Sequence, residues 1–597
     1  MSQPASSPPE GSGSRTRRAT AVLVVALGAL AAALAYTRQP GPAQADGGPP
    51  PPAIRVNQAG YPAGAPKLAI AVDASGAART AEIRREDGAT VTSVAVGPAQ
   101  ADAQSGDTVR VIDFSTVTTP GTYVVAIAGL GESDPVHVAD DAYRRPLYLA
   151  MRSYYGQRCG TEVDLGSAFP GYRYAACHLE DALYHPSSGR EGRRPATKGW
   201  HDAGDYGKYI VNSGITTGEL LWAWEWFPSV FRDLTLDIPE SGDDVPDVLD
   251  EIRWNLDWML AMQDEDGGVW HKLTSERFGS FVMPDVDDGA PRYVIGTGNA
   301  PFKSTCATAD LAAVAAIASR AWRAYDTRFA DRALDAARRA WTWAEAHPDA
   351  PFRNPARVAT GEYGDADCGD ERLWASAELL RTTGEAAFEQ VARTLAASRH
   401  IRHDEPQWWP EVTHLGLWAY ALAGEAGADA ALRQRIRAET TEAARAIVRR
   451  TDAAGWRHAL TDANFVWGSN GVAANYGVVL LAAARFSGDR SFRDGARDQL
   501  HYLLGRNTFG LSWLTGVGVR PFRHPHHRPS GGDAHPLPWP GLLSGGPNRN
   551  GGDPVLAKLP KTPPARRYAD AEASYAGNEN AINWNAALVF LLAGLQD

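Results

Sequence analysis

Residues 200–209 read Trp-His-Asp-Ala-Gly-Asp-Tyr-Gly-Lys-Tyr and place two carboxylates three positions apart, directly before an apolar run that predicts a helix. Asp205 stands where an N-cap residue would satisfy the free N–H groups of that helix, a common role for Asp. Two acids so close together also suit chemistry on a water molecule. Gly204 and Gly207 leave room for a bulky substrate beside them. The segment alone therefore leaves two alternatives, a helix cap and a catalytic pair.

Three later segments point to the second alternative. Residues 525–530 read Pro-His-His-Arg-Pro-Ser, residues 541–548 read Gly-Leu-Leu-Ser-Gly-Gly-Pro-Asn, and residues 575–586 read Tyr-Ala-Gly-Asn-Glu-Asn-Ala-Ile-Asn-Trp-Asn-Ala. Together with residues 200–209, and in the same order, they resemble glycoside hydrolase family 9. One such motif is weak, but four in register are specific. The resemblance spans residues 142–597.

The resemblance implies roles for three acids. Asp205 would be the general base, Asp202 would help to hold the water, and Glu579 would be the general acid. An inverting glycosidase needs a protonated acid at the leaving oxygen and a carboxylate that activates water on the opposite face of the sugar. The apolar neighbours of Glu579 predict a raised pKa that keeps it protonated. The alternative for Glu579 is a first-turn residue favoured by the helix dipole.

Seven further residues are candidate contacts to a sugar: His271, Trp374, Trp409, Trp467, His526, Arg528 and Tyr575. The resemblance places His526 and Arg528 in the subsite floor and His271 at another substrate-contacting position. The aromatic residues are candidates because flat rings stack on the apolar faces of sugars. A structural role stays open for His271, and a core position for Trp374, which lies at helical spacing from nearby leucines.

Two thiols and two imidazoles form a possible metal site: Cys159, Cys177, His178 and His201. They are the ligand set of a closed structural zinc site, and the resemblance supports zinc. The alternative is a Cys159–Cys177 disulfide, which export would permit. A disulfide would leave both histidines without a role. We therefore favour zinc, which would also fix the backbone beside Asp202.

Four acids crowd one loop before a predicted helix: Asp365, Asp367, Asp370 and Glu371. So many carboxylates need a cation or solvent, and hard oxygen ligands favour calcium. The spacing is not that of an EF-hand loop, and the resemblance implies a calcium site here. Cys306 and Cys368 have no role assigned from the sequence.

The composition restricts the class of partner. The 597 residues carry a net charge of −11 with acidic and basic residues well mixed, so no cationic face is expected to bind nucleic acid. The 19 Trp and 20 Tyr instead suit a saccharide ligand. A β-glucan polysaccharide or oligosaccharide is the expected partner. Neither a protein partner nor an organic cofactor is implied.

The pattern along the chain divides it in two. Residues 54–139 hold short β-rich runs between Gly and Pro, which predict a small β-sandwich that resembles the immunoglobulin-like module of one branch of the family. From residue 140 to residue 597 Ala-rich helical patterns dominate. About a dozen helices suit an (α/α)6 barrel, the fold that the resemblance also implies. The expected protein is mainly α, with the sandwich preceding the catalytic barrel.

The N-terminus has the features of an export signal. Basic residues precede an apolar run over residues 21–36, and Ala43-Gln44-Ala45 offers a signal-peptidase site. We expect residues 1–45 to be a signal peptide and the protein to be secreted. The 16-residue run is short for a membrane anchor, which is the less favoured alternative. Residues 46–53 would then be a stiff Pro-rich linker.

The sequence thus predicts a secreted inverting endo-β-1,4-glucanase that acts on cellulose or related β-glucans. Two enzymes of the same fold are alternatives, an exo-acting cellodextrinase and an exo-β-glucosaminidase. A glycan-binding protein without catalysis is a third. The joint presence of Asp202, Asp205 and Glu579 argues against the last.

Overall fold

The computed structural model describes residues 50–75, 77, 79–287 and 290–596. The predicted signal peptide or anchor, residues 1–45, lies outside the described residues. Among the helices within them, none combines the length and the apolar character that a membrane crossing requires.

The N-terminal domain is a sandwich of two antiparallel sheets. One has the order β1-β2-β6-β5, and the other has the order β4-β3-β7-β8 with β9 also paired to β7. Along β3, Ala81 and Ile83 point into the core while the end residues are exposed, the period-two pattern of a half-buried strand. The strands are β1 (Ile54–Arg55), β2 (Leu68–Val72), β3 (Thr80–Arg85), β4 (Thr90–Ala95), β5 (Gln100–Ala101), β6 (Thr108–Asp113), β7 (Gly121–Ile127), β8 (Gly131–Glu132) and β9 (Val136–Val138).

Six helices form an inner ring, in which α3 packs on α6, α6 on α8, α8 on α10 and α12 on α16, which returns to α3. They are buried around most of their circumference because helices flank them on both sides; in α16 nearly every residue is buried. They are α3 (Ile210–Trp226), α6 (Thr305–Trp322), α8 (Gly369–Thr383), α10 (Thr413–Leu422), α12 (Ser469–Ser487) and α16 (Ile582–Gly594).

Six further helices form an outer ring that completes the predicted (α/α)6 barrel. They are more amphipathic, as in α7, where Ala333, Ala337, Ala340 and Ala344 recur every three or four residues on the buried face. The outer helices are α2 (Arg144–Gly156), α5 (Asp247–Ala261), α7 (Thr327–Ala346), α9 (Ala386–Ala396), α11 (Ala430–Ala453) and α13 (Ser491–Leu503).

Short elements in the loops support the site described below. A four-stranded sheet has the order β12-β15-β14-β13, and β10 pairs with β11. The bounds are β10 (Val163–Asp164), β11 (Arg173–Tyr174), β12 (Leu183–Tyr184), β13 (Lys208–Tyr209), β14 (Lys272–Ser275), β15 (Arg292–Ile295), α4 (Pro228–Arg232), α14 (Arg528–Gly532) and α15 (Tyr575–Asn578), with 3-10 turns at Pro186–Ser188, Pro284–Val286, Asp462–Asn464, Leu556–Lys558 and Pro564–Arg566.

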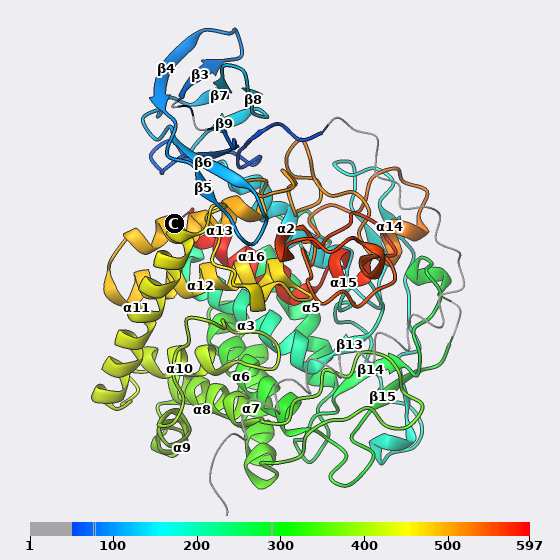
Figure 1. Cartoon of the computed structure of the whole chain (residues 1–597). Coiled ribbons are helices and arrows are strands. Elements are labelled where there is room, and N and C mark those ends of the chain that lie inside the picture. The colour runs from blue at the N-terminus through cyan, green and yellow to red at the C-terminus, as the bar shows by residue number, and fades with distance from the viewer. Residues whose placement is uncertain (1–49, 76, 78, 288–289, 597) are drawn as a thin grey trace, which may run out of the picture.

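The sandwich contacts the barrel through a buried tryptophan. In Figure 1 the sandwich, in blue, stands on one side of the helical domain. Trp456, after α11, packs against Ile70 and Val109 of the sandwich. Its indole N–H donates to Ser105 Oγ at 3.0 Å. The contact is therefore apolar at its centre, and the single polar group of the Trp456 side chain has a hydrogen-bond partner.

Cys306 and Cys368, to which no role was assigned from the sequence, form a disulfide. Cys306 lies in the first turn of α6, and Cys368 directly precedes α8. The bond therefore ties together the starts of two neighbouring helices of the inner ring.

Candidate active site and metal sites

The four sequence motifs converge on the backbone around Glu579. The His526 N–H donates to Asn578 O at 2.9 Å, and the Gly545 N–H donates to Glu579 O at 2.7 Å. From the first motif, the Gly204 N–H donates to Oε1 of the Glu579 side chain at 3.3 Å. A Cβ on Gly204 would lie 2.1 Å from His526 O, so only glycine allows the two segments to approach this closely. Tertiary packing thus sets Glu579 beside the 202–205 pair.

Asp202 is almost fully buried and accepts two strong hydrogen bonds. Asn212 Nδ2 donates to Oδ1 at 2.6 Å, and the Tyr363 hydroxyl donates to Oδ2 at 2.7 Å. Burial and then the charge of Asp205 raise the pKa of Asp202 to about 7, although these two donors oppose the rise. Asp202 is therefore poised to exchange a proton near neutral pH.

Asp205 does not cap the helix, so the capping alternative is wrong. The N-cap residue of α3 is Tyr209, without a side-chain cap, because Lys208 and Tyr209 first pair as β13 with β14. Asp205 Oδ2 instead accepts from the Gly207 N–H at 2.9 Å and from the Tyr209 hydroxyl at 3.3 Å. Asp205 as a residue is partly exposed. It is therefore oriented by its own turn and open to a ligand.

Glu579 ends α15 and precedes the start of α16 at Ile582, so it is not a first-turn residue. Burial, followed by the charges of Asp205 and Asp202, raises the pKa of Glu579 well above its usual range. A carboxyl group held protonated beside two other acids has the property required of a general acid.

Two candidate sugar contacts have other roles. Trp374 is fully buried in α8, with its ring against Gly218 of α3, so the stacking prediction is wrong and the core alternative holds. His271 is also buried. Its Nδ1 lies 3.2 Å from Ser304 Oγ, its Nε2 lies 3.0 Å from Glu362 O, and its ring stacks on Phe352. Both ring nitrogens already have protein partners, which corrects the prediction that His271 contacts the sugar.

Arg528 is likewise committed to the protein. Its guanidinium donates to the carbonyls of Gly204 at 2.8 Å, Ser280 at 3.1 Å and Gly279 at 3.2 Å. It therefore positions the Gly204 turn, and its contact with the sugar stays a prediction. His526 is partly exposed, and its Nδ1 lies 2.7 Å from Glu572 O.

The remaining aromatic candidates are partly exposed and fall into two pairs. Trp409 packs edge-on against Tyr363 with ring centroids 5.0 Å apart. Trp467 lies against Tyr575 at 5.7 Å, and Tyr575 lies at the same distance from His526. One pair thus adjoins the donor to Asp202, and the other adjoins the segment that holds Glu579. These places suit rings that stack on a sugar.

Sequence reasoning missed Asn212 and Tyr363 as partners of Asp202. Asn212 lies ten residues after Asp202, inside the helix that follows the motif. Tyr363 lies 161 residues after Asp202. The two residues meet only because the 354–363 segment folds back over β13 and β14. Tyr209 belongs to the quoted motif, but its contact with Asp205 depends on the turn between them.

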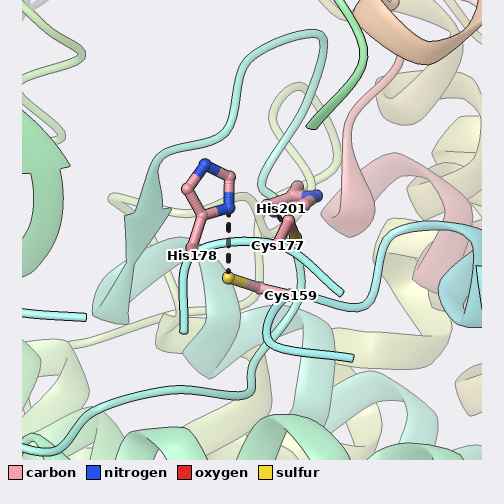
Figure 2. Close-up of side chains that lie close together, drawn as sticks. All are labelled: Cys159, Cys177, His178 and His201. Atoms are coloured by element: carbon pink, nitrogen blue, oxygen red, sulfur yellow. Dashed lines mark hydrogen bonds between the residues drawn. The ribbon is translucent and has the colours of Figure 1, made fainter. Parts of the chain in front are cut away.

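Figure 2 shows the two thiols and two imidazoles of the predicted zinc site turned toward one another. One ligand atom from each of Cys159, Cys177, His178 and His201 lies within 4.8 Å of all the others. Both cysteines are free thiols in the structure, so the disulfide alternative is not formed. The donor set fits a tetrahedral zinc ion. Asp287 Oδ2 lies 3.1 Å from His178 Nε2, an outer contact that orients the imidazole.

The predicted calcium loop brings together three of its four acids. Carboxylate oxygens of Asp365, Asp370 and Glu371 lie within 4.8 Å of one another. The side chain of Asp367 is 81% exposed and accepts from the Gly369 N–H, so its assignment as a ligand is wrong. In the turn that leads into α8, the Asp367 carboxylate accepts a backbone N–H and points away from the other three acids.

A fourth acid, Asp310 of α6, faces this cluster and was missed from the sequence. Neither of its buried carboxylate oxygens has a hydrogen-bond partner within the described part of the chain. Burial and the charges of Asp370 and Asp365 raise its pKa well above the usual range. Unpaired buried carboxylates are costly, and a hard cation would satisfy them. The residues present therefore fit a calcium site better than the loop alone suggests.

Comparisons with known proteins agree with this architecture. Residues 143–592 match the model of glycosyl hydrolase family 9, and residues 50–132 match the cellulase N-terminal ig-like domain. Endoglucanase D of Acetivibrio thermocellus is 35% identical over 544 residues, covering 91% of this chain and 83% of that protein. A xyloglucan-specific endo-β-1,4-glucanase of Bacteroides ovatus is 37% identical over 572 residues, covering 92% and 94%.

Solved structures show the same fold. The crystal structure of a Zn-binding triple mutant of a family 9 endoglucanase superposes with a TM-score of 0.83 at 34% identity, covering 90% of this chain and 99% of that one.

Proposed function

Because the chain belongs to glycoside hydrolase family 9, we propose that it cleaves internal β-1,4-glucosidic bonds of cellulose or related β-glucans with inversion at the anomeric carbon. The protein is a glycoside hydrolase, and its relatives support endo-β-1,4-glucanase activity. Mixed-linkage β-glucan and xyloglucan are further substrate candidates, the latter because one relative is specific for it.

One observation carries the proposal. The turn that holds Asp202 and Asp205 donates its Gly204 N–H to the carboxyl group of Glu579. An acid with a strongly raised pKa therefore lies beside a pair of further carboxyl groups. An inverting hydrolase requires such a division between a proton donor and a base.

The roles follow from the environments. Glu579 gives its proton to the leaving glycosidic oxygen as that bond breaks. Asp205, partly exposed, removes a proton from the water whose oxygen forms the new bond to the anomeric carbon. Asp202, held in place by Asn212 and Tyr363, orients that water through a hydrogen bond. Glu579 ends ionised and Asp205 protonated, so a proton must return through solvent before the next turnover.

The metal sites are structural in this proposal. Cys159, Cys177, His178 and His201 would hold zinc, and His201 would thereby fix the backbone next to Asp202. Asp365, Asp370 and Glu371, with Asp310 facing them, would hold calcium at the start of α8. Neither ion enters the chemical steps described above.

Export is also proposed. The predicted signal peptide supports it, and so does the Cys306–Cys368 disulfide, because such bonds persist in oxidising compartments. We further propose that the β-sandwich braces the barrel rather than binds substrate. Its buried contact through Trp456 supports this role.

The decisive experiment is proton NMR of the first product released from a soluble β-glucan. An α-anomer is expected, and an initial β-anomer would exclude inversion and the roles given to Asp205 and Glu579. In parallel, product sizes from cellulose, mixed-linkage glucan, xyloglucan, xylan and chitosan identify the substrate. A rapid fall in viscosity supports endo action, whereas exclusive release of small products from one chain end would indicate one of the exo-acting alternatives.

A further inference from the structure

Lys272, at the start of β14, carries a buried ammonium group whose direct partners are all neutral. The side chain has no exposed surface. Its Nζ lies 2.7 Å from Asn354 Oδ1 and 2.7 Å from Gly361 O. Thr360 supplies two more acceptors, Oγ1 at 3.1 Å and its carbonyl at 3.4 Å. No carboxylate of the described residues forms an ion pair with this ammonium.

Two other buried lysines of the catalytic domain differ in this respect. Lys208 Nζ lies 3.0 Å from an oxygen of Asp181. Lys303 Nζ lies 2.6 Å from Asp264 and 2.9 Å from Asp266. Burying a charge is costly unless it is paired, so an ammonium left without a contacting carboxylate requires another reason for its place.

The acceptors of Lys272 belong to the segment that delivers Tyr363 to the active site. Gly361 precedes Tyr363 by two residues, and Asn354 also donates its side-chain amide to Thr360 O at 2.8 Å. His271 binds the same segment through Glu362 O. Lys272 and the residue directly before β14, His271, thus fasten the backbone that leads to Tyr363, whose hydroxyl binds Asp202.

The charge of Lys272 also faces the proposed base. Its Nζ lies 5.6 Å from the centroid of the Tyr209 ring, and the Tyr209 hydroxyl donates to Asp205 Oδ2 at 3.3 Å. The other titratable groups that face the 202–205 turn include Asp202, Glu579, Tyr209 and Arg528, whose guanidinium donates to Gly204 O. Of these four, only Arg528 is positively charged. Lys272 therefore supplies a second positive charge near Asp205.

Resting on the roles proposed above, we propose that Lys272 is a positioning residue that holds the Tyr363 segment in place and favours the ionised form of Asp205. Burial lowers the pKa of Lys272 to about 7, while the charges of Glu362 and Asp205 act against this. The ammonium is therefore charged at acidic pH.

The test compares Lys272→Met with Lys303→Met in the full chain. Methionine keeps much of the length of lysine but removes the donors and the charge. We expect Lys272→Met to lower kcat about tenfold with KM changed less than about twofold, because the affected groups act on the water rather than on the sugar chain. The acidic limb of kcat/KM against pH should move upward by roughly half a unit, since loss of a nearby positive charge disfavours the ionised base.

Lys303→Met removes a buried ammonium that touches neither the Tyr363 segment nor Tyr209, so its acidic limb should stay in place. Asn354→Asp provides a second variant for the case that Lys272→Met does not fold. It is nearly isosteric, sets a carboxylate against the ammonium and should also shift the acidic limb upward. A limb that stays fixed in every folded variant of Lys272 and Asn354, or one that shifts equally in Lys303→Met, overturns the proposal.

Failure of this inference is distinguishable from failure of the proposed function. Wild-type protein that hydrolyses none of the β-glucans, or that releases the β-anomer first, contradicts the proposed function itself. If the wild-type protein is inverting and Lys272→Met has the same pH profile as the wild type, only the role of Lys272 is contradicted.

Discussion

The hydroxyl of Tyr363 donates a 2.7 Å hydrogen bond to Oδ2 of Asp202, although 161 residues separate the two in sequence. Asn212 occupies the other oxygen of the same carboxyl group. Both donors favour the ionised form of Asp202, against the effects of burial and of Asp205. The protonation of Asp202 is thus balanced by groups from two parts of the chain, the local segment with Asp205 and Asn212, and the distant Tyr363.

Tyr363→Phe should disturb that balance without disturbing the fold. Loss of the donor leaves the pKa of Asp202 above its present value of about 7, so less of it is ionised at neutral pH. We expect kcat to fall about tenfold and stability to change by about 1 kcal/mol. Steady-state kinetics across pH and thermal melting measure both. Tyr476→Phe, which removes a buried hydroxyl bound to Asn464, is the control. Unchanged kcat in Tyr363→Phe would mean that its bond to Asp202 has no catalytic role.

Glu579→Gln should separate the two halves of the reaction. The amide can still accept from the Gly204 N–H, so the turn keeps its shape, but no proton reaches the leaving group. The rate should fall about a hundredfold or more on poor leaving groups and much less on activated aryl glycosides. Asp205→Ala should lose activity on both, because water attack is needed in each case, and added azide should restore part of it. Equal losses of Glu579→Gln on both substrate types would argue against its role as general acid.

The pH dependence of wild-type activity should reflect the same acid. Because burial and the charges of Asp205 and Asp202 raise the pKa of Glu579 well above the usual carboxyl range, its proton is retained to a higher pH than that of an ordinary carboxyl group. Activity is therefore expected to fall on the basic side as Glu579 ionises. This basic limb should be absent or displaced in Glu579→Gln on activated substrates. A limb unchanged in that variant would assign it to another group.

Purified protein should contain about one zinc per chain, because two thiols and two imidazoles in mutual contact bind zinc tightly. Cys177→Ser should lose the metal and melt at a lower temperature, as seen by metal analysis and calorimetry. Wild-type protein without zinc, and with a Cys159–Cys177 disulfide by mass spectrometry, would contradict the site.

The acidic cluster predicts a pH-dependent effect of calcium. Burial raises the pKa of Asp365 to about 6, and burial and like charges raise those of Asp310 and Asp370 further. Without a cation the folded state binds more protons than the unfolded one between pH 4 and these raised values, so stability falls as pH rises through them. Calcium should remove most of that fall, measured as melting temperature at pH 5 and pH 8 with calcium or chelator.

Two matched variants check the assignment of the cluster. Asp370→Asn should reduce the stabilisation by calcium, whereas Asp367→Asn should leave it unchanged because that side chain is exposed and outside the cluster. Equal effects of the two variants would contradict the cluster as the binding site.

Trp456→Ala tests the sandwich as a brace. The indole is fully buried between Ile70, Val109 and the barrel, so its removal should cost about 3 to 5 kcal/mol. Melting temperature should fall, while glucanase activity per folded molecule stays the same. If the isolated sandwich were instead retained on cellulose in a pull-down, a binding role would have to replace the bracing one.

Local pattern in the sequence predicted the elements well. The Ala-rich helical patterns expected from residue 140 onward are present as the twelve helices of the barrel. The short β-rich runs expected over residues 54–139 are present as strands β1 to β9. Periodicity predicts helices and strands here because the side chains on the buried face of each element recur at a fixed spacing in the sequence.

The sequence by itself also determined which residue types the sites would need, because the first and the last of the four motifs carry the three acids, and segments 159–178 and 365–371 carry the predicted metal ligands other than His201. Only the tertiary structure decided how these residues are used. The Trp374 ring is buried in the core, the Arg528 guanidinium binds backbone carbonyls, and the Asp367 side chain is exposed to solvent. Residues from distant segments also contact the sites. Tyr363 binds Asp202, Lys272 binds the Tyr363 segment, and Asp310 faces the acidic cluster. The reason is physical: hydrogen bonds, charge and burial act through space, and which groups meet depends on how the twelve-helix barrel and its loops close.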